Sequence, residues 1–508
     1  MVRTLYKFFG PVLAAGLATG AAAELSDLHL PVIPRTEDEA ARIAKITAPT
    51  TDFSQPERFE ANSAGAATVR VRPTGDAFSQ PSANISFERE LEFKVGNGLF
   101  KKLWVSAPSS TLASDGLGPL YNARSCQRCH LKDGRGHPPE SPDDSAVSML
   151  VRVSIPADDS ALSEVIEDYI ATAPEPTYGG QIQDFGIAGH PAEARIAITY
   201  EEHEVELAGG EVVRLRKPAL ALDNLGYGPL HPETMTSARV APQMIGLGLL
   251  DAIPAADILA RADPDDTDGD GISGRPNIVW SDVHDQPMLG RFGVKAGKPS
   301  VWEQSAAAFH GDIGISTPLH PTGYGDCTKT QANCRAAPDG NTADHDDAEI
   351  GQLGLELVSF YSSNLAVPAR RDYDDPQVLR GKQMFYETGC TSCHTPKFVT
   401  HRLGGQPEQS FQLIWPYTDM LLHDMGEGLA DNRPEARATG REWRTAPLWG
   451  IGLTQQVSGH SYFLHDGRAR SLMEAILWHG GEADAARDRV VKMPKPDRDA
   501  LVRFLESL

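Results

Sequence analysis

The pattern Cys-x-x-Cys-His occurs twice in this sequence. The two copies are Cys126-Gln-Arg-Cys129-His130 and Cys390-Thr-Ser-Cys393-His394. The pattern is typical of haem c attachment, in which two thiols bond to the porphyrin and the histidine binds the iron. A redox dithiol or half of a zinc site is the alternative explanation. Because the whole pattern is repeated, we expect two covalently bound haem c groups.

The group on the far side of each iron decides the chemistry of that iron. An electron-transfer haem usually has two axial ligands, whereas a haem that reacts with peroxide needs an open or openable face. After the second motif, Ser471 and Glu474 form a capping box that begins a helix. Leu472, Ile476 and His479 then share one face of this helix.

His479 is therefore a predicted ligand of the second iron, and Met425 is its rival. The first iron has no such clear partner. His137 is very close to the motif, and Met149 and His190 are further choices. An open first iron is the remaining alternative, and the sequence does not decide among them.

Helices must bring these side chains to the haems. Residues 381–385 are predicted to form a helix that leads into the second motif, and residues 499–508 carry an apolar face. Residues 98–104 precede the first motif in a similar way, which indicates a weak internal repeat. A helix before the cysteines and an apolar terminal helix that crosses it are the frame of cytochrome c.

We therefore expect a mainly α fold with two cytochrome c-like haem domains. The C-terminal domain is predicted at 366–508. The N-terminal domain, at 24–365, is expected to be enlarged by loop and short-strand insertions, including a strand pair near 196–215.

The first 23 residues have the features of a secretory signal peptide. Arg3 and Lys7 give a basic start, an apolar stretch at 12–17 follows, and three alanines at 21–23 form a cleavage site. We expect a periplasmic protein without a membrane span after cleavage, and a retained N-terminal anchor is the alternative. Cys327 and Cys334 are predicted to form a loop disulfide, which suits an oxidising compartment better than a metal pair does.

The net charge of −22 disfavours binding to nucleic acid or anionic lipid. It would suit a basic redox partner, although solubility alone explains it more simply. A separate acidic motif, Asp266-Thr-Asp268-Gly-Asp270-Gly271, has the start of a calcium loop. Because Asn277 stands where a full EF-hand has glutamate, a solvated acidic turn is the alternative to calcium.

The chain resembles a known family around the second haem. The segment Phe463-Leu-His465-Asp466-Gly467-Arg468 and the helix start after it are similar to a block of bacterial dihaem cytochrome c peroxidases and MauG enzymes. The resemblance places the distal ligand on that helix, where His479 stands. Segments 422–426, 442–450 and 476–483 are closer to a dihaem oxidoreductase subfamily often labelled thiol oxidoreductase or peroxidase. That likeness covers nearly the whole mature chain.

The resemblance implies that the N-terminal haem reacts with hydrogen peroxide. It also implies a glutamine and a glutamate ten residues apart beside that haem, a pattern that Gln183 and Glu193 match. Glu193 would move a proton between the peroxide oxygens, and Gln183 would position the peroxide. The Trp-Asp-Gly-Arg segment of the family is replaced here by residues 178–180, Tyr-Gly-Gly. A surface glutamate and a loop glutamine are the alternative.

Together these features predict a periplasmic dihaem c-type oxidoreductase of the peroxidase or MauG type. Peroxide would react at the N-terminal haem, and electrons from a small redox protein or a protein substrate would pass through the C-terminal haem. A non-enzymatic dihaem electron-transfer cytochrome is the alternative. Thiol oxidation is disfavoured, because haem attachment leaves no free Cys-x-x-Cys pair.

Overall fold

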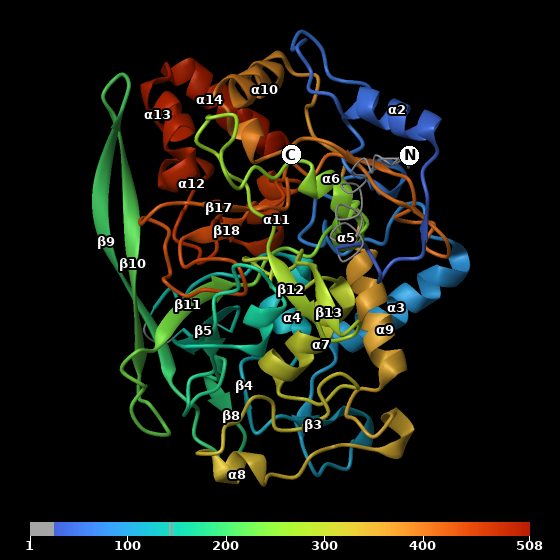
Figure 1. The fold of residues 1–508 in the computed structure, drawn as a ribbon, viewed down its shortest axis with the longest axis vertical. Helices are drawn as coiled ribbons and strands as arrows, with labels where there is room; N and C mark the ends of the chain where they lie inside the picture. Colours follow the sequence, from blue (N-terminus) through green and yellow to red (C-terminus); the bar gives the residue numbers. More distant parts are fainter. Residues whose placement is uncertain (1–24, 142–143, 146) are drawn as a thin grey trace, which may run out of the picture.

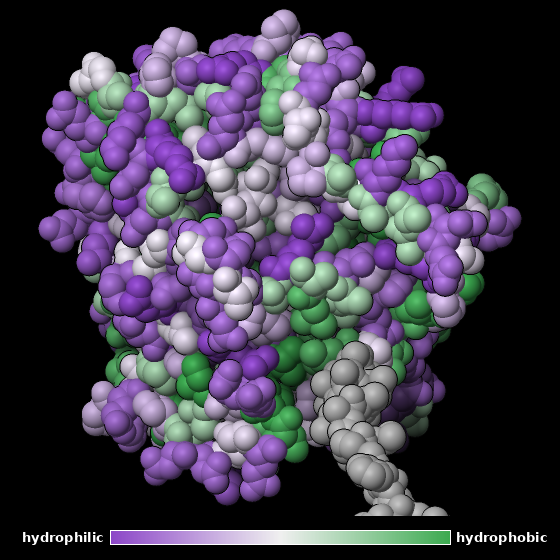
Figure 2. All heavy atoms as spheres, turned by 45° about the horizontal axis from the view of Figure 1, so that its top comes forward, coloured by the Kyte–Doolittle hydropathy of each residue, from purple (hydrophilic) through white to green (hydrophobic). Residues whose placement is uncertain are grey.

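The computed structural model describes residues 25–141, 144–145 and 147–508 (Figure 1). The predicted signal peptide at 1–23 lies outside the described residues. Within them, no helix is long and apolar enough to cross a membrane. Hydrophilic side chains dominate the face drawn in Figure 2, as expected for a chain with a net charge of −22.

The prediction of a mainly α fold with two cytochrome c-like domains is wrong. Only 29% of the chain is helical and 19% is strand, and the strands belong to many small sheets. The physical reason is visible in the composition, because 37 prolines and 47 glycines end regular elements early. Short ladders and irregular loops therefore build much of the structure around the helices that carry the motifs.

The helices are mostly short. Their bounds are α2 (Glu37–Thr47), α3 (Phe87–Lys101), α4 (Cys126–Cys129), α5 (Leu247–Asp251), α6 (Ala255–Leu259), α7 (Val301–Ala308), α8 (Ala332–Arg335), α9 (Gln352–Ser363), α10 (Pro376–Glu387), α11 (Thr454–Ser458), α12 (Leu472–Trp478), α13 (Asp484–Lys492) and α14 (Lys495–Ser507). A π-helical turn, η5 (Phe309–Ile313), continues α7.

One four-stranded sheet is built around β5 (Met149–Pro156), which pairs with β6 (Thr172–Ala173), β7 (Gln181–Ile182) and β11 (Met235–Val240). The remaining strands form two-stranded ladders. These join β1 (Val32–Ile33) to β15 (Arg402–Leu403), β2 (Val105–Ser106) to β3 (Asp115–Leu117), β4 (Leu120–Tyr121) to β8 (Phe185–Gly186), β12 (Ile278–Ser281) to β13 (Gln286–Leu289), β14 (Phe398–Val399) to β16 (Leu413–Ile414) and β17 (Leu422–Asp424) to β18 (Glu442–Arg444).

A long hairpin confirms the predicted strand pair and extends it. Strands β9 (Arg195–Leu207) and β10 (Glu211–Asp223) pair along their whole length, and Gly209 and Gly210 in the turn both have positive φ. Figure 1 shows the hairpin along one side of the molecule, beside α12 and α13. The backbone of Ala208 at its tip donates a hydrogen bond to Val491 O at 2.8 Å.

Two helix pairs reveal the internal repeat. Helix α3 precedes the first motif and packs against α9, which follows that motif, and α10 precedes the second motif and packs against α14, which follows it. Each pair crosses at a glycine, because a Cβ on Gly96 would overlap Leu357 O and a Cβ on Gly381 would overlap Ala500 O. One turn later, Phe100 and Phe385 are both buried. The two crossings are therefore built in the same way.

The segments before and after the predicted boundary at 365/366 pack together. Glu60 is 1% exposed and pairs with Arg370 and with Lys382, whose Nζ lies 2.8 Å from it. One hydrophobic cluster also joins Phe78 to Trp449. The placement of the domain boundary stays a prediction.

We expect Gly96→Ala to destabilise the protein by about 2–4 kcal/mol, because its methyl group would force α3 away from α9. Gly98→Ala in the same helix is the matched control, since a Cβ there has nothing within 4 Å. It should stabilise by about 0.5–1 kcal/mol. Urea unfolding of the haem-loaded proteins measures both, and equal effects would contradict the proposed close crossing.

Candidate haem sites

The four cysteines and two histidines of the motifs line one cavity of about 690 Å³. The four thiols are Cys126, Cys129, Cys390 and Cys393, and they form no disulfide. The predicted disulfide between Cys327 and Cys334 is confirmed. The fold therefore separates the structural cysteines from those available for haem attachment.

The two motif histidines are oriented in the same way. His130 Nδ1 lies 2.8 Å from Pro242 O, and His394 Nδ1 lies 2.9 Å from Tyr417 O. A carbonyl oxygen only accepts, so Nδ1 carries the proton and Nε2 is left free for a metal. Burial lowers the pKa of both imidazoles to about 4. Both rings are therefore neutral at pH 7, as an iron ligand must be.

The cavity walls fit two haem groups. Burial raises the pKa of Cys126 to about 12 and that of Cys390 to about 11, so these thiols are protonated at pH 7. The ring of Phe100 lies 6.3 Å from that of His130, and the ring of Phe385 lies 6.2 Å from that of His394. Each site thus offers two thiols, a free imidazole nitrogen and an aromatic wall.

His479 faces His394 across the cavity. His479 ends α12, and its Nδ1 donates to Ala475 O at 2.7 Å, which leaves Nε2 free. The two imidazole centroids are 6.4 Å apart. An iron with two Fe–N bonds of about 2 Å would separate them by roughly 6.3 Å. The spacing therefore fits bis-histidine ligation of the second haem.

The other candidate ligands lie in less suitable places. Met425 lines the cavity and packs against a cluster of buried apolar residues. Met149 also lines it, but its side chain packs with Tyr178 and Val240 in another cluster. His137 and His190 are not among the described residues that line the cavity.

Gln183 and Glu193 are close together but lie behind the cavity wall. Gln183 is 3% and Glu193 1% exposed, and the backbone N–H of Gln183 donates to the carboxyl of Glu193 at 2.7 Å. Gln331 Nε2 donates to the other carboxyl oxygen of Glu193 at 2.5 Å. Burial raises the pKa of Glu193 well above its ordinary value. Neither side chain is among the described residues that line the cavity.

The acidic loop brings together a different trio from the predicted one. Ligand oxygens of Asp263, Asp266 and Asp268 lie within 4.8 Å of one another, whereas Asp270 is not part of this group. Asp270 instead accepts a bond from the backbone of Ile272 at 2.8 Å. Asp263 lies before the recognisable motif, which is why the sequence pattern did not identify it.

An ion cluster beside the second motif was not predicted from the sequence. His423 is 2% exposed, and its two ring nitrogens lie 2.8 Å from Asp419 and 2.7 Å from Glu482. Burial is the largest single effect and opposes the charged imidazolium, but Asp419 and Cys393 together raise the pKa of His423 well above its ordinary value. Glu482 also accepts bonds from Ser273 at the end of the acidic loop. In the sequence, only Asp419 and His423 are close neighbours, so the contact with Glu482 could not be predicted from local spacing.

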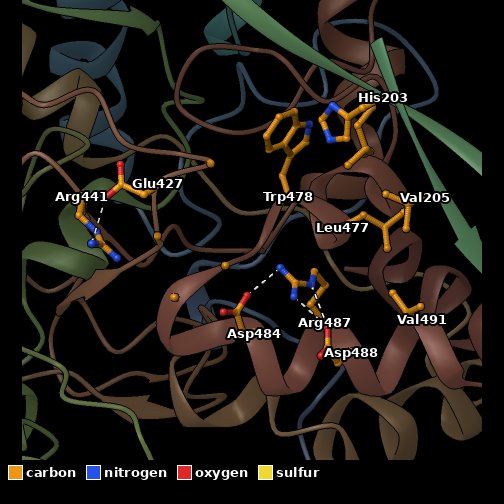
Figure 3. Close-up of a pocket in the computed structure, with 15 residues that line it drawn as sticks. His203, Val205, Glu427, Arg441, Leu477, Trp478, Asp484, Arg487, Asp488 and Val491 are labelled. Carbon is orange, nitrogen blue, oxygen red and sulfur yellow. Dashed lines mark hydrogen bonds and ion pairs between the residues drawn. The ribbon is translucent and has the colours of Figure 1, made fainter. Parts of the chain in front are cut away.

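A second pocket of about 580 Å³ lies between the β9–β10 hairpin and α12–α13. Figure 3 shows the indole of Trp478 facing His203, with their ring centroids 5.2 Å apart. Arg487 pairs with Asp484 and Asp488, and it donates to His479 O at 3.1 Å. This pocket therefore borders the outer side of the segment that carries His479.

We expect His423→Leu to cost about 3–5 kcal/mol, because two buried carboxylates would lose their shared cation. The folded-state pKa of His423 is raised, so its contribution is complete below pH 6.5 and is lost as pH rises through the folded pKa. Denaturant unfolding should therefore show a larger deficit for the variant at pH 6 than at high pH. A deficit that does not change with pH would contradict a charged His423.

Comparison with known proteins shows the family of the chain. The family model described as "Di-haem oxidoreductase, putative peroxidase" matches residues 59–508. No curated protein matches the chain. Hydrazine synthase of Kuenenia stuttgartiensis, solved under xenon pressure, is similar at 18% identity and a TM-score of 0.22. That similarity covers 38% of this chain and 65% of the other. The family match spans most of the sequence and both motifs, and the chain belongs to the di-haem oxidoreductase family.

Proposed function

We propose that this chain is an exported dihaem c-type oxidoreductase of the peroxidase type. Peroxide reacts at the haem held by His130, and electrons arrive through the haem held by His394. The observation that carries the proposal is that two similarly built sites in one cavity differ in the presence of a second histidine. The ring centroids of His479 and His394 are 6.4 Å apart, so His479 can be the second ligand of one iron. No comparable histidine partner of His130 is found in the described residues.

The reaction balances as H₂O₂ + 2 H⁺ + 2 e⁻ → 2 H₂O. The two electrons come from a small redox protein, one at a time, or from an oxidisable side chain of a protein substrate. The bound haems would supply the redox chemistry. The chain supplies neutral imidazoles and the cavity that they line.

In this proposal Gln183 and Glu193 are positioning residues. Gln183 Nε2 donates to Gly311 O at 2.8 Å, and Glu193 fixes the backbone of Gln183. Gly311 belongs to η5, whose next residue, Asp312, lines the cavity. The pair therefore supports the cavity wall on the side of the first motif.

The test combines haem content with peroxide consumption. The wild-type protein should carry two haems per chain and consume peroxide with a one-electron donor. Replacing Cys126 and Cys129 by alanine should remove one haem and abolish turnover. Replacing Cys327 and Cys334 is the matched control, because neither is among the described residues that line the cavity and two haems should remain. Two haems without any peroxide turnover would favour simple electron transfer instead.

We also propose that the acidic loop binds Ca²⁺ through Asp263, Asp266 and Asp268. Asp263→Asn should weaken calcium binding at least tenfold, because it removes one charged ligand. Asp270→Asn changes the same charge outside the trio and should have a smaller effect. Isothermal titration calorimetry of the calcium-free protein measures the calcium affinity of both variants. The trio is the wrong ligand set if Asp270→Asn has the greater effect.

A further inference from the structure

Helices α7 and α12 begin with the same cap. Ser300 Oγ accepts the backbone N–H of Glu303 at 3.2 Å, and Ser471 Oγ accepts that of Glu474 at 3.1 Å. Each helix precedes the second member of its helix pair, α9 or α14, and each borders the haem cavity. The repeat therefore extends from the paired helices to these two shorter ones.

Four residues on each helix line the cavity at the same distances from the two cap serines, and Ala307 on α7 lines it without a counterpart on α12. These distances are one, four, five and eight residues, which define a single helical face. The matching pairs are Val301 with Leu472, Gln304 with Ala475, Ser305 with Ile476 and Ala308 with His479. Position eight is thus occupied by the predicted ligand His479 in one helix and by the methyl group of Ala308 in the other.

From this match we infer that Ala308 leaves one face of the His130-held haem open, and that Gln304 and Asp312 line this face as binding groups for hydrogen peroxide. The inference rests on the proposed function and deepens it. Alanine has no atom that can bind iron, so the repeat supplies no axial ligand at this position. Where α12 offers Ala475, α7 offers the polar Gln304.

Gln304 and Asp312 have the chemistry that a peroxide needs. The side-chain amide of Gln304 has no hydrogen-bond partner among the described residues and lines the cavity. Asp312 also lines it, and its carboxyl accepts a bond from Gln181 Nε2 at 2.9 Å. Burial raises the pKa of Asp312, and Arg152 and the hydrogen bond from Gln181 partly oppose this effect. Amide and acid together can bind both oxygens of peroxide.

Asp312 also lies beside the first motif. Its carboxylate is the charged group that most strongly raises the pKa of the Cys126 thiol, after the larger effect of burial. Its backbone oxygen accepts bonds from Asn122 at 2.9 Å and from Ala123 at 3.0 Å, just before the motif. The end of α7 and the first haem attachment segment are therefore joined directly.

The decisive experiment places a ligand on the open face. Wild-type ferric protein should show one low-spin and one high-spin haem by electron paramagnetic resonance, and azide should bind to one iron per chain. In Ala308→His the high-spin signal should disappear and azide affinity should fall at least tenfold. Ala308→Leu is the matched control, because leucine has a similar size without a nitrogen, and the high-spin signal should remain.

Haem content shows whether each variant has folded. A high-spin haem that persists in Ala308→His, with two haems bound, would overturn the inference. It is also overturned if wild-type protein has two low-spin haems and Met149→Leu releases one of them. If Ala308→His does not incorporate two haems, azide binding to the wild-type protein remains as the test. Wild-type protein that binds no azide would contradict an open face.

The contribution of Gln304 and Asp312 to ligand binding needs a separate measurement. Fluoride on ferric haem accepts hydrogen bonds, so Gln304→Leu and Asp312→Leu should each raise its dissociation constant at least tenfold. Unchanged fluoride binding in both variants would exclude these residues from the open face. These spin-state and ligand measurements do not depend on turnover. A protein with one open haem that ignores peroxide would refute the proposed function and leave the open face intact.

Discussion

A hydrogen bond from imidazole Nδ1 to a backbone carbonyl fixes each histidine that faces a haem position. His130, His394 and His479 all make this bond, at 2.8, 2.9 and 2.7 Å. The bond selects one tautomer and aims Nε2 into the cavity. Without it, no hydrogen bond would fix the tautomer and orientation of these rings. Much of the surrounding structure serves to place those three carbonyl groups.

The carbonyls come from different kinds of structure. Ala475 lies one helical turn before His479, so α12 provides its own acceptor. Pro242 follows strand β11, and Tyr417 lies in irregular backbone before β17. These long-range partners explain why short ladders and loops surround the motif helices. The glycine crossings at Gly96 and Gly381 then set how closely the helices of each pair approach.

Charged groups inside the cavity wall are compensated locally. Glu435 pairs with Arg239 at 2.7 Å and with Arg433 at 3.2 Å, and these arginines keep its pKa low despite burial. On the same wall, the indole of Trp443 stacks on His465 with 3.6 Å between ring centroids. Burial lowers the pKa of His465 to about 4, so this ring is neutral at pH 7. The interior between the motifs thus combines neutral rings with paired ions.

The sequence by itself identified the Cys327–Cys334 disulfide and predicted the haem attachment residues and His479, because each depends on short spacing that local chemistry dictates. It also indicated the family. Only the tertiary structure placed Gln183 and Glu193 behind the wall, joined His423 to Glu482 and brought Asp263 into the acidic trio. These contacts depend on how distant loops pack, and no local periodicity records that. The match between Ala308 and His479 also required the structure. The two residues differ in type and match only in their position on the helical face that lines the cavity.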